Sequence, residues 1–376
     1  MTLTQRPDTT IAKGRAPNRL GKKEERRIGW FMAGPAVILL LGFLIIPFFM
    51  AFYFSFTNQR LISPNPAEPV GWNNFSRLLT VNTITLDPIT DDAGNFVVDD
   101  EGNLTFPRIR DFTRNNPDYP ELQGLQEWTS IPWFGEGSRL FLLASDAVFM
   151  RGVINTFIFA AVIAPVQGGL GLVLALLVNK RSRAVNIFRT IYFMPVVMSM
   201  VVVALLWRFI YSPTSGMFNN ILSFLTFGAF EGVDWLGNPS TALPAIIILS
   251  VWQGVGFHMI IWLSGLQTIP GYLYEAAAID GATRWNQFKH VTWPGLRNVA
   301  VFVLITITIA AFGLFTQVDV MTRGGPLDST QTVVFQAVQN GFESQDIAYG
   351  STISVVFFIM VLIVAMIQRY LTREAD

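Results

Sequence analysis

Few residues of this 376-residue chain have the types or spacing that catalysis or metal binding requires. The absence of cysteine excludes disulfides, thiolate metal ligands and cysteine nucleophiles. The two histidines, His258 and His290, are too few for a site built from several imidazoles. There is no Gly-x-x-x-x-Gly-Lys-[Ser/Thr] sequence, the loop that holds nucleotide phosphates in many ATPases. We therefore expect a protein that is not an enzyme and binds no metal or cofactor itself.

Polar and aromatic side chains inside apolar segments are the best candidates for contact with a small molecule. Two sets share one helical face each: Gln253, Phe257, Ile260 and Ser264; and Thr308, Ala311, Phe312 and Phe315. An aromatic ring beside a hydrogen-bonding group suits a neutral sugar, which offers both C–H faces and hydroxyls. The alternative is helix packing with satisfied polar groups, which is favoured for any one of these residues and for His258.

The segment from residue 269 to residue 294 has the composition of two short helices joined by a sharp turn. Pro270 suits the start of the first helix, and Gly281 suits the left-handed turn that ends it. Thr283 to Val291 can form the second helix, and Pro294 should break the chain after it. Such a rigid helix pair with exposed Ala, Phe and Trp suits a groove on another protein. The alternative is an amphipathic hairpin lying on a membrane surface.

The elements that carry these residues must be membrane helices. The chain is 51% hydrophobic and only 14% charged, against about 25% charged in soluble domains. Lys+Arg and Asp+Glu are equal, so nothing indicates a nucleic-acid partner. A helix needs about 20 apolar residues to cross the bilayer. Six windows meet this length: Trp30–Tyr53, Gly152–Val178, Ile187–Tyr211, Ala242–Leu266, Asn298–Val320 and Ile347–Gln368.

The distribution of basic residues predicts the orientation of these six spans. Lysine and arginine gather before the first span, at 180–183, at 284–297 and after the last span. The alternate loops contain few basic residues: none at 212–241 and only Arg323 at 321–346. We therefore expect both termini and the 270–294 loop in the cytoplasm.

The predicted organisation has a polar insert between the first and second spans. Its regions are a tail at 1–28, a first helix at 29–56, an extracytoplasmic insert at 57–151, a five-helix core at 152–370 and a tail at 371–376. Alternation near Phe96 and Leu104 predicts a short hairpin within the insert. The acidic stretch at Asp91 lacks the ligand run and closing Glu of an EF-hand, so a folded cap is favoured over a calcium site.

Charges and helix breakers inside the spans bear on the mechanism. No Asp, Glu or Lys lies mid-membrane, and Arg208 and Asp319 lie near the outer ends of their spans. This pattern weighs against proton or sodium coupling, which needs intramembrane carboxylates, although an ion-coupled secondary transporter stays as the alternative. Pro165 and Pro195 should interrupt the second and third spans.

The 270–294 loop contains Glu275-Ala276-Ala277, Asp280-Gly281-Ala282, Phe288 and Pro294 at fixed spacing. In these residues the loop resembles the EAA motif of ABC importer permeases. The resemblance implies that Glu275, Ala276, Ala277, Asp280, Gly281 and Ala282 dock on an ATP-hydrolysing subunit. ATP and magnesium would then be held by two such partner subunits, not by this chain.

A second resemblance, to carbohydrate permeases of the maltose-transporter type, covers the chain from about Asn155 onward. It rests on Trp252-Gln253-Gly254, Leu266-Gln267-Thr268-Ile269-Pro270 and Met321-Thr322-Arg323-Gly324-Gly325-Pro326. It implies the all-α type I ABC importer permease fold in a bacterial cytoplasmic membrane, with a second permease subunit and an extracytoplasmic sugar-binding protein as partners. Candidate sugar contacts are Gln253, Gly254, Phe257, Thr308 and Ala311, although Ile307, Ala311 and Leu314 lack the polar groups of the maltose protein.

Overall fold

The computed structural model describes residues 22–100, 102–133, 137–180 and 183–372. The predicted tails at 1–28 and 371–376, and the basic residues Arg181 and Arg373, therefore lie wholly or partly outside the described residues. The chain divides into two compact units, residues 1–50 and 51–376, which are described separately.

The N-terminal unit consists of one long helical run. It comprises α1 (Lys22–Leu40), the π-helical turn η1 (Leu41–Ile45) and α2 (Ile46–Phe54), whose last residues belong to the second unit. Its apolar part, Arg26–Phe54, has 29 residues and is about 43 Å long at 1.5 Å per residue. That length is sufficient to cross a bilayer, so the structure contains the first predicted span.

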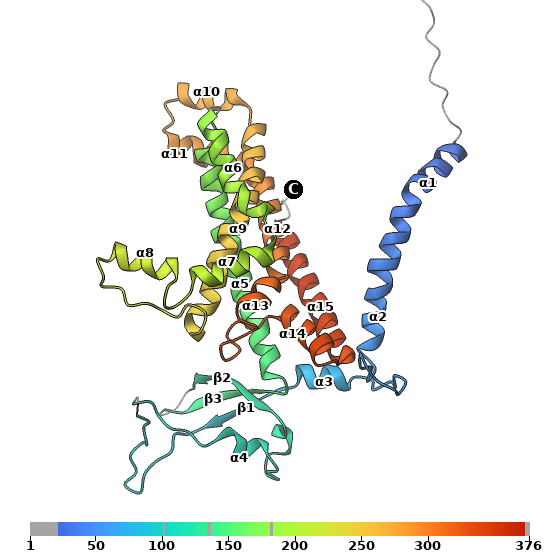
Figure 1. The fold of residues 1–376 in the computed structure, drawn as a ribbon, viewed down its shortest axis with the longest axis vertical. Coiled ribbons are helices and arrows are strands. Elements are labelled where there is room, and N and C mark those ends of the chain that lie inside the picture. The colour runs from blue at the N-terminus through green and yellow to red at the C-terminus, as the bar shows by residue number, and fades with distance from the viewer. Residues whose placement is uncertain (1–21, 101, 134–136, 181–182, 373–376) are drawn as a thin grey trace, which may run out of the picture. The chain divides into compact units, whose positions relative to one another are not determined.

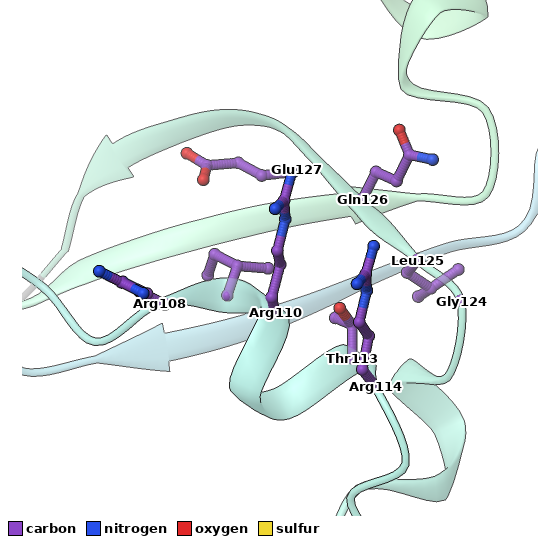
Figure 2. Close-up of a pocket in the computed structure, with 9 residues that line it drawn as sticks. Arg108, Arg110, Thr113, Arg114, Gly124, Leu125, Gln126 and Glu127 are labelled. Carbon is purple, nitrogen blue, oxygen red and sulfur yellow. The ribbon is translucent and has the colours of Figure 1, made fainter.

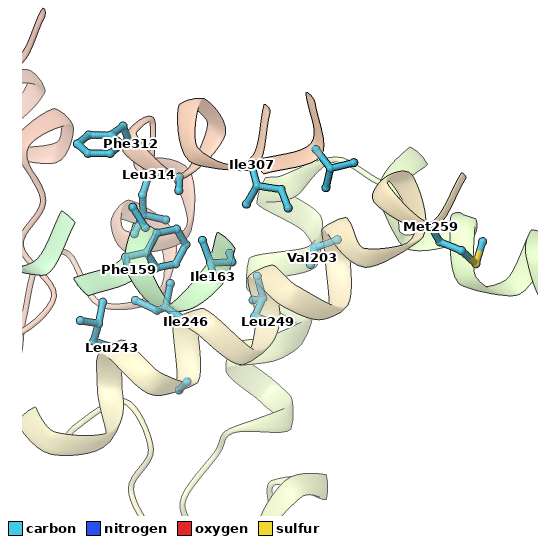
Figure 3. Packing of buried hydrophobic residues seen from close by; sticks show 14 of the residues in the cluster. Phe159, Ile163, Val203, Leu243, Ile246, Leu249, Met259, Ile307, Phe312 and Leu314 are labelled. Carbon is cyan, nitrogen blue, oxygen red and sulfur yellow. The ribbon is translucent and has the colours of Figure 1, made fainter. Parts of the chain in front are cut away.

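The second unit is a bundle of long apolar helices. Its members are α5 (Ala147–Leu177), α9 (Pro239–Thr268), α12 (Trp293–Phe312) and α15 (Ile347–Thr372), joined by α6 (Arg183–Val197). Figure 3 shows the core where Phe159 of α5, Leu249 of α9 and Ile307 of α12 meet. Shorter helices complete the unit: α7 (Met200–Ile210), α8 (Met217–Leu225), α13 (Thr316–Met321), α14 (Val333–Val338) and the π turn η4 (Gln339–Glu343).

Glycines allow these helices to approach closely. A Cβ atom at Gly171 of α5 would lie 3.3 Å from the backbone nitrogen of Met259 on α9. At Gly256 of α9, a Cβ atom would collide with the backbone carbonyl of Tyr192 on α6. The crossings of α9 with α5 and α6 thus depend on residues without side chains, as is common in membrane bundles.

Two predicted spans are not continuous helices. The window Ile187–Tyr211 is divided into α6 and α7, whose axes are bent by 100°. We expected Pro195 to interrupt this span, but the break lies beyond it, where Ser199 is extended with ψ 133°. The window Asn298–Val320 likewise ends as a helix at Phe312, and α13 follows as a separate element.

The prediction that Pro165 interrupts the second span is wrong. Helix α5 continues from Ala147 to Leu177 with Pro165 inside it. A proline removes one helical hydrogen bond, and neighbouring helices packed around it compensate for that loss in a membrane bundle. Here α9 and α12 pack along α5, with Ile163 buried in the shared core near the proline.

The insert between the first two spans folds as a small sheet with helices. Strands β1 (Val81–Leu86), β2 (Gln126–Pro132) and β3 (Arg139–Ala144) form an antiparallel sheet in the order β1-β3-β2. Ile84 pairs with Phe141, and a bulge separates Glu127 from Thr129. Its helices are α3 (Asn73–Leu79), α4 (Ile109–Thr113) and the 3-10 turn η2 (Pro120–Leu122). The sheet lies where α5 begins, at the end of the bundle opposite to α10 and α11 (Figure 1).

The predicted hairpin exists, and its acidic residues act as turn caps. A β-bridge joins Val98 to Leu104, as the alternation predicted. Asp91 Oδ1 accepts hydrogen bonds from the backbone nitrogens of Ala93 and Asn95, at 2.9 and 2.8 Å. These bonds, with that from Asn95 foremost, hold the pKa of Asp91 below its ordinary value. The described residues contain no group of three or more acidic or histidine side chains suited to a metal.

A cluster of polar side chains, partly buried, connects the insert to the bundle. Asp146, between β3 and α5, accepts a 2.5 Å hydrogen bond from the Tyr349 hydroxyl of α15 and 3.3 Å bonds from Gln336 of α14. Arg77 of α3 forms a 3.4 Å ion pair with Asp346, next to α15. These contacts connect the insert to α14 and α15.

Candidate functional site

The loop after α9 forms two helices with a glycine turn between them, as predicted. Helix α10 (Gly271–Ile279) is followed by Asp280 and then by Gly281, whose φ is 74°. The Ala282 nitrogen donates to Ala277 O at 2.9 Å, which closes the helix end. Glycine takes this left-handed conformation at the lowest cost because it has no Cβ atom, which explains its place here.

The second helix begins at a capped turn and joins α12 directly. Thr283 caps α11 (Arg284–Gln287), its hydroxyl accepting from the Asn286 nitrogen at 3.3 Å. The π turn η3 (Phe288–Thr292) then leads into α12. Pro294, which we expected to break the chain, lies in the first turn of α12. The wider π turn explains the difference, because the nitrogen of Trp293 donates to Phe288 O and the helix loosens just before the proline.

We call residues 271–292 the elbow. Its two arms are held together by a 3.0 Å hydrogen bond between the hydroxyls of Tyr274 and Thr292. The rings of Trp285 and Phe288 stack with centroids 5.6 Å apart. These contacts make the elbow a stiff unit continuous with α12 and joined to α9 through Ile269 and Pro270.

The outer surface of the elbow is apolar and exposed. Ile279 is 87% exposed and Trp285 is 69% exposed. Glu275, Ala276 and Asp280 are also exposed, whereas Ala277 and Ala282 are half-buried against the elbow itself. Exposed large apolar side chains on a rigid helix pair are typical of a surface that another protein covers.

Three predicted sugar contacts lie together on α9. Phe257 is 45% exposed, and Gln253 and Gly254 are half-buried. A Cβ atom at Gly254 would collide with the side-chain amide of Gln167 on α5. That amide nitrogen donates a hydrogen bond to Ser250 O at 3.3 Å. Gly254 therefore has a packing role that its sequence context alone did not reveal.

The other two candidates face the inside of the bundle. The Thr308 hydroxyl donates to Leu304 O at 2.7 Å and accepts from Gln368 of α15 at 2.8 Å. Ala311 is buried in the main core. In this conformation both residues serve helix packing. His258 also has a packing role, since it is buried and its Nδ1 donates to Gly254 O at 3.0 Å.

Two cavities were not anticipated from the sequence, because each is lined by residues that are far apart in the chain. One, of about 740 Å³, lies between α5, α6 and α9 and has an almost entirely apolar lining that includes Tyr192 and Trp252. The other, of about 600 Å³ at the end of α7, combines Arg208 and Asp234 with the exposed ring of Phe209. The second has the charged and aromatic groups that a sugar can contact, and the sequence signal for it was Arg208 at a span end.

Comparisons with known proteins agree with this arrangement. A family model described as "Binding-protein-dependent transport system inner membrane component" matches residues 167–375. The lactose transport system permease protein LacF of Rhizobium radiobacter is 36% identical over 246 residues, which cover 64% of this chain and 82% of LacF. The trehalose/maltose transport system permease protein MalF of Thermococcus litoralis is 37% identical over 231 residues, which cover 61% of this chain and 77% of that protein.

A solved structure supports the fold. The crystal structure of a bacterial ABC transporter involved in the import of the acidic polysaccharide alginate contains a chain that matches with a TM-score of 0.66. The match covers 94% of this chain and 98% of that one at 18% sequence identity, so it bears on the fold alone.

Proposed function

Because the chain belongs to the family of binding-protein-dependent transport system inner membrane components, we propose that it is a permease subunit of an ATP-driven sugar importer. Its cargo would be a neutral mono- or oligosaccharide. Two similar proteins are named for transport of lactose and of trehalose and maltose, which supports this class of substrate. The composition of the described spans also supports a neutral cargo. Helix α5 beyond Arg151 and all of α9 contain no acidic or basic residue except the buried His258. The same scarcity disfavours ion coupling.

The elbow is the observation that carries the proposal. One of two ATP-binding subunits on the cytoplasmic side, which together hold ATP and magnesium, would grip the elbow at the predicted coupling residues Glu275, Ala276, Ala277, Asp280, Gly281 and Ala282. Closure of the two subunits would then displace α9 and α12 together, because the elbow lies directly between these two helices in the chain. In this scheme both termini are cytoplasmic. A second permease subunit, related by a pseudo-twofold axis, would complete the pathway.

Transport would follow alternating access, in which the pathway opens to one side of the membrane at a time. A soluble binding protein would deliver sugar at the end of the bundle that carries the insert. The cavity lined by Arg208, Phe209 and Asp234 is a candidate first contact, since guanidinium and carboxylate groups bind hydroxyls and an aromatic ring covers C–H faces. The exposed Phe257 on α9, beside Gln253, would offer a second.

Purification and reconstitution test the proposal directly. Affinity purification of this chain from its host membrane should recover an ATPase and a second permease. Proteoliposomes containing this complex should take up sugar only with internal ATP and the binding protein present. Uptake that continues without ATP and collapses when a proton or sodium gradient is dissipated would refute the proposal and favour an ion-coupled transporter.

A further inference from the structure

The insert contains an open pocket lined by three arginines (Figure 2). The pocket has a volume of about 780 Å³ and lies between α4 and the start of β2. Arg110 lies in α4, Arg114 follows its end and Arg108 precedes it, and in Figure 2 the side chains of Arg110 and Arg114 both point toward β2. Gln126 and Glu127 line the side formed by the strand. The chain thus concentrates positive charge at one place on a segment that is otherwise rich in acidic residues.

These three guanidinium groups have no anionic partner within the described part of the chain. The ion pairs found there join Arg77 to Asp346 and Arg151 to Asp328, and neither involves the pocket. All three arginines are exposed, so each can present its planar donor face to an incoming group.

Glu127, the carboxylate that lines the pocket, does not neutralise them. Burial raises the pKa of Glu127, and the charge that partly offsets this effect is Arg151, at the start of α5. In Figure 2 the Glu127 carboxylate points away from Arg114, and among the described residues no ion pair joins it to Arg108 or Arg110. The pocket therefore keeps a local positive charge that an external anion would stabilise.

The geometry suits carboxylates carried on a protein. Arginine binds carboxylates through two parallel N–H···O bonds, and a cluster of exposed arginines also speeds the approach of an acidic surface. The volume exceeds what one carboxylate needs, so the pocket accepts a protruding loop or helix end with several acidic side chains. It belongs to the insert, at the end of the bundle opposite to the elbow, where a delivered sugar would arrive.

We propose that Arg108, Arg110 and Arg114 form a docking pocket for an acidic protrusion of the extracytoplasmic binding protein. This inference rests on the proposed function, because it requires a binding protein. To the proposed function it adds the residues and the chemistry of recognition. The three arginines would form bidentate contacts with carboxylates of the binding protein at the edge of the sheet, away from the sugar pathway.

The test uses the complete transporter in lipid nanodiscs and its binding protein. Affinity is measured by surface plasmon resonance at about 20 and 200 mM NaCl for the wild type and for the triple variant Arg108→Gln, Arg110→Gln, Arg114→Gln. We expect the triple variant to bind about tenfold more weakly at low salt, because exposed ion pairs are individually weak but add in a cluster. The salt dependence of its affinity should also be flatter, since fewer charges are paired. Arg60→Gln removes an exposed arginine elsewhere in the insert and is the control.

Each outcome separates this inference from its alternatives. Unchanged affinity in the triple variant, or an equal loss in Arg60→Gln, would overturn it. Binding of free galacturonate to the wild type, with unaltered binding-protein affinity in the triple variant, would also overturn it, since the pocket would then recognise a small acid. Basal ATPase activity and the thermal midpoint show whether the variant is folded. Retained ATP-driven uptake at saturating binding protein would leave the proposed function intact even where the pocket assignment fails. A wild-type transporter without affinity for a binding protein would refute both.

Discussion

Replacing Gly281 with leucine should uncouple ATP hydrolysis from sugar uptake. Gly281 has a φ of 74°, and an added Cβ atom would meet nothing within 4 Å. The penalty is therefore conformational and not steric: a side chain in the left-handed region costs roughly 1–2 kcal/mol. A cost of that size lowers the population of the native turn by a factor of about 5–30. The turn would relax by losing the hydrogen bond from Ala282 to Ala277, and α10 would no longer be held at a fixed angle to α11.

The assay is the number of sugar molecules imported per ATP hydrolysed in proteoliposomes that contain the complete transporter. Gly281→Leu should retain ATPase activity but show a several-fold lower ratio. Gly281→Asn should retain more coupling, because asparagine tolerates the left-handed region. Gly271→Leu is the matched control, since Gly271 has open space around it and an ordinary φ. Wild-type coupling in Gly281→Leu, or equal damage in Gly271→Leu, would refute the assignment of the elbow as the mechanical link.

Three further substitutions test the packing of the bundle and its anchor to the insert. Tyr349→Phe removes the hydroxyl bonded to Asp146 and should destabilise the protein by about 1–3 kcal/mol, measured as a lower thermal midpoint in detergent. Tyr370→Phe, at an exposed site, is the control and should leave the midpoint unchanged. Gly256→Ala places a Cβ atom against a backbone carbonyl of α6 and should lower the free energy of unfolding by about 1–3 kcal/mol. Gly169→Ala, which has free space around it, should not lower it. Equal thermal midpoints for the two variants would contradict the close helix crossing. Thr308→Val removes the hydrogen-bond acceptor for Gln368 and should lower the thermal midpoint without changing the sugar concentration for half-maximal uptake. A changed sugar affinity with unaltered stability would instead indicate that Thr308 contacts the sugar.

Local rules were sufficient to predict several elements from the sequence. Membrane helices need only a sufficient apolar length, so each of the six apolar windows overlaps a long helix or the bent pair, although the window Asn298–Val320 extends past the end of its helix at Phe312. The elbow likewise follows from short-range chemistry: Gly281 supplies the turn, and Thr283 caps the next helix. The hairpin at Val98 and Leu104 follows from alternation over a few residues. In each case the residues that decide the conformation are close neighbours in the chain.

The candidate sugar contacts show where this reasoning stops. Residue spacing shows which side chains share one face of a helix, but it does not show which other helix packs against that face. Thr308 and Phe257 have similar sequence contexts, yet one is bonded to α15 and the other is exposed. Only the arrangement of the bundle separates them, because each contact depends on a residue far away in the chain.

The sequence by itself determined that the chain has several apolar segments long enough to cross a membrane and that the elbow turns at Gly281. The tertiary structure alone decided that Pro165 stays within a continuous helix, that α6 and α7 bend by 100° and that three arginines surround one pocket of the insert. The physical reason is the range of the interactions involved. Apolar length and backbone conformation act over a few residues. In contrast, the effect of a proline and the bend of a helix depend on distant segments that pack against them, and an arginine stays unpaired where the fold brings no carboxylate to it.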